Sequence, residues 1–102
     1  MAISNTTINT NLQAIYTSTG DSAVVTGYFC NISANPATFS VHVVPNGDSA
    51  GSSNIIYSNV NLTAEDTYVW DTEKLILGNG DSIWAVASDD GVIVATICNV
   101  AV

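Results

Sequence analysis

Hydrophobic and polar residues alternate along most of this chain with a period of two. Between residues 37 and 43 the odd positions are apolar, and the even positions are Thr38, Ser40 and His42. Between residues 8 and 16 the even positions carry most of the apolar side chains. Successive side chains of a strand point to opposite faces, so this pattern predicts half-buried β-strands. No stretch shows the 3.6-residue period of an amphipathic helix.

Turn signals separate the apolar segments. They are clusters of Gly, Pro, Asn and Asp at residues 19–21, 35–36, 45–51, 78–81 and 89–91. The segments between them are residues 8–16, 24–33, 37–43, 54–60, 67–70, 75–77, 82–88 and 92–102. Short strands at this spacing predict an all-β fold, an antiparallel β-sandwich of about eight strands that is Ig-like or jelly-roll-like. A small closed β-barrel is the alternative.

Three segments carry more specific expectations. Residues 1–7 are rich in Ser, Thr and Asn, so we expect a flexible polar arm before a single domain over residues 8–102. Residues 24–33 are apolar at both alternating sets of positions, which predicts a strand buried on both faces. Residues 92–102 have no Lys or Pro to protect an edge. We expect this last strand to be central in its sheet or paired with another chain.

The charge balance excludes a class of partners. The 102 residues, 47% of them hydrophobic, are enough for one domain with a core. They include a single basic residue, Lys74, against nine acidic ones, for a formal net charge of −8. Nucleic acids and anionic membranes bind through Lys and Arg, so neither is an expected partner. The first residues show neither the basic nor the apolar region of a secretory signal, and we expect folding in a cytoplasm.

The two cysteines, Cys30 and Cys98, are 68 positions apart in the chain. Two free, buried thiols are the simplest interpretation, because unpaired Cys packs as a small hydrophobic residue. A disulfide between an early strand and the last strand is the alternative, although a reducing compartment disfavours it.

Residues capable of catalysis are few. His42 is the single histidine, and its position opposite the apolar set predicts a solvent-facing strand residue rather than a general base. Asp71 and Glu73 alternate onto one side of an extended segment and could form an acid/base pair, but solvated turn carboxylates are the simpler interpretation. We therefore expect no enzyme activity and no catalytic residue.

Metal and sugar sites have equally weak signals. Asp48, Asp81, Asp89 and Asp90 lie in loops rich in Gly and Asn that could supply oxygen ligands to Ca²⁺, but they form no EF-hand spacing. One His and two distant Cys do not make a zinc site. Trp70, Trp84 and the tyrosines could stack on a sugar, but each lies within an apolar strand, which predicts packing instead. We expect no metal and no cofactor.

Several phrases of the sequence resemble a known family. They are residues 21–33 (Asp-Ser-Ala-Val-Val-Thr-Gly-Tyr-Phe-Cys-Asn-Ile-Ser), residues 37–41 (Ala-Thr-Phe-Ser-Val), residues 62–67 (Leu-Thr-Ala-Glu-Asp-Thr) and residues 77–88 (Leu-Gly-Asn-Gly-Asp-Ser-Ile-Trp-Ala-Val-Ala-Ser). From residue 16 onward the chain resembles small β-sandwich structural proteins of tailed bacteriophages, including those of marine and cyanobacterial hosts. No catalytic motif belongs to that resemblance, so it implies no site residue.

The resemblance implies a component of the virion, made in the host cytoplasm. A capsid decoration (cement) protein is the leading expectation. A tail, baseplate or fibre-associated module is the alternative, and such a module could recognise a host-surface glycan through loops 45–53 and 89–91. The implied partners are other virion proteins, either the major capsid protein or tail and baseplate subunits. The resemblance also implies a homo-oligomer, with a trimer favoured.

Overall fold

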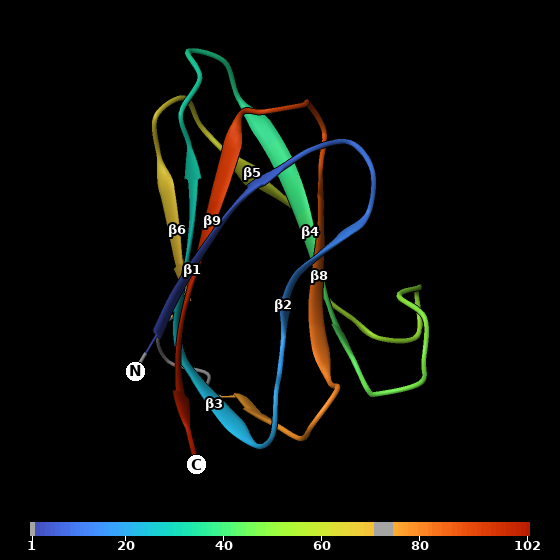
Figure 1. Cartoon of the computed structure of the whole chain (residues 1–102). Coiled ribbons are helices and arrows are strands. Elements are labelled where there is room, and N and C mark those ends of the chain that lie inside the picture. The colour runs from blue at the N-terminus through green and yellow to red at the C-terminus, as the bar shows by residue number, and fades with distance from the viewer. Residues whose placement is uncertain (1, 71–74) are drawn as a thin grey trace.

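The computed structural model describes residues 2–70 and 75–102, and these residues form two antiparallel sheets (Figure 1). The first sheet contains β1 (Ala2–Ile8), β9 (Ile93–Ala101), β3 (Ser22–Asn31) and β6 (Thr67–Trp70) in that order, with β7 (Leu75–Leu77) also paired to β3. The second sheet contains β2 (Gln13–Thr17), β8 (Ser82–Ala87), β4 (Ala37–Val44) and β5 (Ile55–Leu62). The expected all-β sandwich is confirmed.

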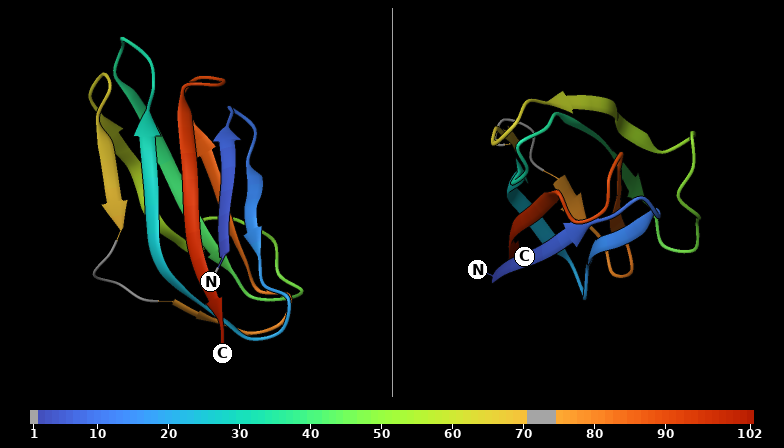
Figure 2. Two further views of the ribbon diagram at one scale, coloured as in Figure 1. Left: turned by 60° about the vertical axis from the view of Figure 1, so that its left-hand side comes forward. Right: turned by 90° about the horizontal axis from the view of Figure 1, so that it is seen from above.

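The order of the strands identifies the type of sandwich. With the three-residue β7 set aside, the first sheet holds the first, eighth, third and sixth strands of the chain. The second sheet holds the second, seventh, fourth and fifth. This is the order of a jelly roll, in which consecutive strands alternate between two facing sheets except at the central hairpin, here β4–β5. Figure 2 shows the two layers from the side and from above. They do not close into a barrel, so that alternative is wrong.

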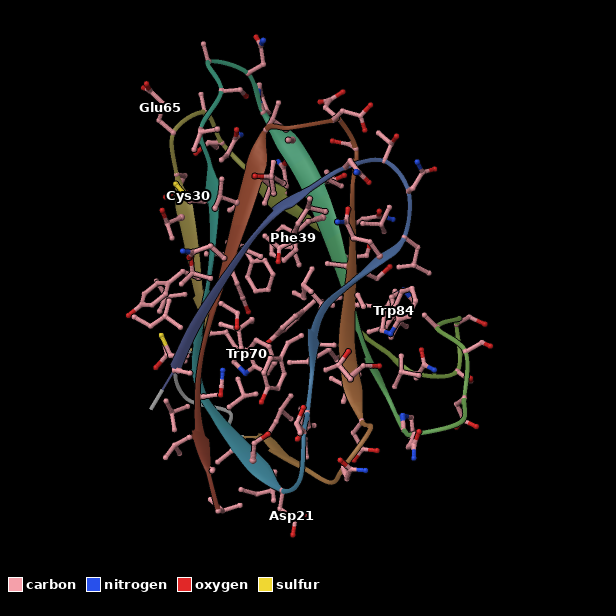
Figure 3. All side chains as sticks on the ribbon, in the orientation of Figure 1. Asp21, Cys30, Phe39, Glu65, Trp70 and Trp84 are labelled. Atoms are coloured by element: carbon pink, nitrogen blue, oxygen red, sulfur yellow. The ribbon has the colours of Figure 1, made fainter. Side chains whose placement is uncertain are left out.

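Aromatic side chains fill the space between the sheets. Phe29 of β3 stacks on Phe39 of β4, with ring centroids 4.6 Å apart, and so joins the two layers. Tyr68 and Trp70 of β6 meet Tyr57 of β5 edge-on at 5.3 and 5.9 Å. Phe39 and Trp70 lie between the sheets in Figure 3. Offset-stacked and edge-to-face arrangements suit the charge distribution of aromatic rings, so this cluster binds the layers together.

A glycine in β3 makes room for the largest core side chain. Gly27 is paired with Trp70 in the register between β3 and β6. A Cβ atom at Gly27 would lie 2.9 Å from Cε3 of the Trp70 ring, closer than carbon atoms pack. Trp70 retains only 2% of its exposure and is confirmed as a core residue. The inner side of the first sheet is therefore tightly packed.

The start of the chain differs from the expected polar arm. Residues 2–8 form β1, which pairs with β9 in an unbroken register from Ala2–Asn99 to Ile8–Ile93. Its Ser, Thr and Asn side chains gave no core pattern because only Ile8 is fully buried at this edge of the sheet. Backbone pairing, which does not depend on hydrophobic side chains, makes the strand.

Other strand assignments needed correction in detail. The expected strand over residues 8–16 is two strands, since Ile8 ends β1 and Gln13 begins β2 in the other sheet. A bulge between Ala14 and Tyr16 turns Ile15 into the core and leaves Ala14 exposed, against the predicted alternation. β3 is not buried on both faces. Phe29 is fully buried, whereas Tyr28 points outward and keeps 41% of its exposure.

The last strand is central, as one of the two expectations for it required. β9 lies between β1 and β3 and pairs with both. Its inward set, Ile93, Ala95 and Ile97, is completely buried. Its apolar edge is thus covered within the chain by β1.

Candidate functional site

The single histidine is not solvent-facing, which corrects the prediction for it. His42 lies on the outer side of the second sheet but keeps only 7% of its exposure. Its Nδ1 lies 2.8 Å from the carbonyl oxygen of Gly51 and 3.0 Å from Oδ1 of Asn54. Both neighbours are acceptors, so Nδ1 carries the ring hydrogen and donates hydrogen bonds to the loop between β4 and β5. The ring holds that loop against the sheet.

The proposed acid/base pair cannot be placed. Asp71 and Glu73, together with Lys74, lie outside the described residues.

The aspartates suggested for Ca²⁺ lie at opposite ends of the sandwich. Asp81 lies at one end, where the backbone N–H of Asn46, two residues before Asp48, donates to Oδ1 of Asp81 at 2.8 Å. Asp89 and Asp90 lie at the other end, where the Gly91 N–H donates to the carbonyl of Ile8. Oδ2 of Asp81 also accepts the Gly78 N–H at 2.8 Å, so this carboxylate organises turns. Residues 2–70 and 75–102 contain no group of three or more metal-ligating side chains.

Asp90 has a structural role of the same kind. Its Oδ1 accepts the backbone N–H of Thr10 at 2.7 Å and the Thr10 hydroxyl at 2.9 Å. These two hydrogen bonds, the backbone one first, hold the pKa of Asp90 below its ordinary value. The carboxylate thereby fastens the β1–β2 loop to the β8–β9 turn.

The two loops suggested for glycan recognition do not form one site. Residues 45–53 lie beside the turn at Asp81, whereas residues 89–91 lie beside Ile8 at the far end. The aromatic residues offer little for stacking, because Trp70 is buried and Trp84 is half-buried with its Nε1–H donating to Ser82 Oγ at 2.8 Å. An open pocket of about 310 Å³ at Ile56, Tyr57, Trp70 and Leu75 is apolar along its described lining.

The cysteines are unbonded and half-buried, so the free-thiol interpretation is confirmed and full burial is not. Cys30 of β3 is paired with Val94, and Cys98 of β9 is paired with Thr26. The two thiols are therefore about four residues apart along adjacent strands, which is on the order of 13 Å and too far for a disulfide.

The surface that remains is the outer side of the first sheet, which we call the neutral face. Register and alternation place on it these outward residues: Ile3, Asn5, Thr7, Ala23, Thr26, Tyr28, Cys30, Thr67, Val69, Ile76, Val94, Thr96, Cys98 and Val100. Large apolar side chains are open to solvent there, with Ile3 67% exposed and Ile76 70% exposed. None of the five strands, within the described residues, contains a charged side chain.

Among the described residues, the acidic side chains lie in connections between strands. They are Asp21, Asp48, Glu65, Asp66, Asp81, Asp89 and Asp90. Figure 3 shows Glu65 and Asp21 at opposite ends of the sandwich. A chain of strong negative charge thus presents a broad surface that carries none. The lack of charged residues in the predicted strands was visible in the sequence, but only the pairing of the strands shows that these neutral residues share one face.

Comparisons of the chain with protein-family models, with curated proteins and with solved structures find no match in any of the three. The part of the chain that the structure describes has no helix able to cross a lipid bilayer.

Proposed function

We propose that this protein is a non-enzymatic structural component of a bacteriophage particle, and that it decorates the capsid through its neutral face. The observation that carries this proposal is the contrast between the uncharged, partly apolar outer side of the first sheet and the acidic ends. The partner is another virion protein, in the first place the major capsid protein.

The chemistry of the neutral face suits docking onto protein. Soluble monomers rarely expose contiguous apolar patches larger than a few hundred Å². The centres of protein interfaces are depleted of charge and enriched in aromatic residues such as Tyr28. On this face Tyr28 lies directly across from Val69 and Thr96, so apolar and hydroxyl groups lie side by side. Such a surface loses little hydration when it is covered.

Two further points favour a particle over a soluble enzyme. The jelly roll is a common architecture of viral capsid proteins and also of lectins, which supports the proposal by analogy of fold. The negative charge of the chain disfavours contact with packaged nucleic acid, which suits a protein on the outside of a shell. Both points agree with the resemblance to structural proteins of tailed phages.

The experiment is to locate the chain on particles. Virions produced from the source genome are purified by density gradient and labelled with an antibody raised against the purified protein. Regular immunogold labelling of heads supports capsid decoration. Labelling confined to tails or baseplates overturns the capsid location in favour of the alternative module, and particles without label overturn the virion proposal altogether.

A matched pair of variants tests the face itself. Val69 on the neutral face is 46% exposed, and Ile56 on β5 of the other sheet is 44% exposed. Particles made without this protein are mixed with purified wild-type, Val69→Lys or Ile56→Lys protein. We expect Val69→Lys to lose binding at least about tenfold, because a buried unpaired ammonium is costly, and Ile56→Lys to bind as wild type. Equal binding by both variants would exclude the neutral face as the docking surface.

A further inference from the structure

The two sheets have four edges, and their exposed backbones differ. The outermost strands are β1 and β6, with β7, in the first sheet, and β2 and β5 in the second. An edge strand presents unpaired N–H and C=O groups that can pair with another chain. Proteins block this with short strands, bulges, proline or charge.

Three of the four edges are blocked in this way. β6 has four residues and β7 has three. β2 has five residues and is bulged between Ala14 and Tyr16. β5 has two register breaks against β4, and Asn59 within it adopts a positive φ of 50°. None of these strands offers a long regular edge to a partner.

β1 is the exception. It runs for seven residues, and its register with β9 has no bulge. Its sequence, Ala-Ile-Ser-Asn-Thr-Thr-Ile, contains no charge, no proline and no glycine. Ala2, Ile3 and Asn5 are exposed. Figure 2 shows β1 beside β9 at the margin of the first sheet, and β2, the next strand of the chain, pairs with β8 in the other sheet.

We infer that β1 pairs with β1 of a second copy, antiparallel and about a two-fold axis, so that two first sheets become one continuous sheet. With the axis at Asn5, Ile3 faces Thr7 of the other copy and Asn5 faces Asn5. Every contact across the axis is then between uncharged residues, and the carboxylates that the structure describes stay in the connections between strands. Two-fold, self-complementary interfaces are the commonest kind among homo-oligomers.

The charge pattern favours a second copy over a charged peptide. β1 offers no countercharge to a basic or acidic strand, so such a partner would desolvate its charges without pairing them. A strand of the same neutral composition has no charged side chain to desolvate. The pair also joins the two neutral faces into one surface. This inference is independent of the virion proposal, because β1 pairing uses the edge of the sheet and particle docking uses its face.

The size of the contact predicts its strength. Seven paired residues span about 23 Å of strand, which buries less than the roughly 800 Å² per partner of a standard stable interface. The dimer is therefore expected to be weak in solution, with a dissociation constant in the micromolar range or above.

The first experiment measures solution mass against concentration by light scattering or sedimentation, from a few micromolar to about 1 mM. We expect a transition from one chain to two. Asn5→Lys places two ammonium groups opposite each other and should raise the dissociation constant at least about tenfold. Asn61→Lys, the same change at an exposed site of β5, should leave it unchanged. A monomer at all concentrations, a mass of three chains, or equal effects of the two variants would overturn β1 pairing.

A second experiment reads the register and does not depend on the lysine variant. In a Cys30→Ser, Cys98→Ser background, single cysteines replace Ile3, Asn5 and Thr7. Only a residue on the two-fold axis faces its own copy at a Cβ separation of about 4.5–5.5 Å. We expect Asn5→Cys to form a disulfide-linked dimer under mild oxidation, and Ile3→Cys and Thr7→Cys to cross-link with each other when mixed. No cross-link in either combination would contradict the proposed register.

Discussion

The outer sides of the two sheets are built from strands of similar composition, yet they meet solvent very differently. Neither set of described strands contains an acidic or basic residue other than His42. On the first sheet, Ile3, Tyr28 and Val69 remain exposed. On β4 of the second sheet the outward residues Ser40 and His42 are buried, and Ile56 at the β5 edge is the large apolar side chain that stays exposed.

Two contacts make the difference: residues 45–54 cover His42, and the Asn59 N–H of β5 donates to Oγ of Ser40 at 2.9 Å. Residues 45–54 return along the outer side of the second sheet, as Figure 1 shows. His42 donates to the loop through Nδ1, and the Val43 N–H donates to the Asn54 carbonyl at 3.0 Å. Trp84, which is paired with His42, is labelled beside this loop in Figure 3. No described connection covers the first sheet in the same way, so it keeps a surface that other molecules can reach.

Removal of β1 should have the largest effect, because it unbalances the first sheet. Deleting residues 1–7 strips one side of β9 of its hydrogen-bonded neighbour. We expect the melting temperature to fall by at least about 10 °C and the protein to become prone to aggregation. Thermal unfolding followed by circular dichroism measures this. An unchanged melt would mean that the second sheet and its loop carry the stability alone.

The inner sides of the sheets can be compared through two glycines. Gly27→Ala drives a methyl group into the Trp70 ring and should lower the free energy of unfolding by about 1–3 kcal/mol. Gly51→Ala, in the loop over the second sheet, meets no atom within 4 Å and is the matched control. Urea unfolding of both variants gives the two values. Equal losses would contradict the tight packing of Trp70 on β3.

The cover of the second sheet depends on His42. His42→Ala removes the donor to Gly51 and should cost about 1–2 kcal/mol, since the part-buried Gly51 carbonyl loses that hydrogen bond. Amide exchange of residues 45–54 should accelerate in the same variant. Tyr28→Ala, on the uncovered face, should cost only about 0.5 kcal/mol in the monomer. A larger loss for Tyr28 than for His42 would reverse the comparison between the faces.

The smallest effect concerns the end of the molecule where β1 turns toward β2. The folded pKa of Asp90 is lowered by Thr10, so its contribution is complete at pH values above the ordinary aspartate pKa. It is lost as the pH falls through the lowered folded pKa. Asp90→Ala should therefore lower the melting temperature by no more than a few degrees at pH 7, with the difference from wild type vanishing in acid. Asp89→Ala, its exposed neighbour, is the control.

The sequence by itself determined the fold class and the places where the chain turns. Period-two alternation identified β4, and Gly, Asn and Asp clusters marked the ends of β2, β7 and β8, because these signals arise from local backbone preferences. For the uncharged last strand the sequence left two places open, central in its sheet or paired with another chain, and the structure has the first. The sequence equally determined that charge would be scarce and acidic.

Tertiary structure alone decided which residues share a face. β1 lacks a hydrophobic pattern, and its place in the first sheet depends on pairing with β9, 91 residues later at Asn5 and Thr96, where the Thr96 hydroxyl also donates to Oδ1 of Asn5. His42 looked solvent-facing because alternation describes the side of a strand, not what covers that side. The loop that buries it contacts the sheet through non-local hydrogen bonds. The neutral face is likewise a product of pairing among five separate strands, which no local pattern encodes.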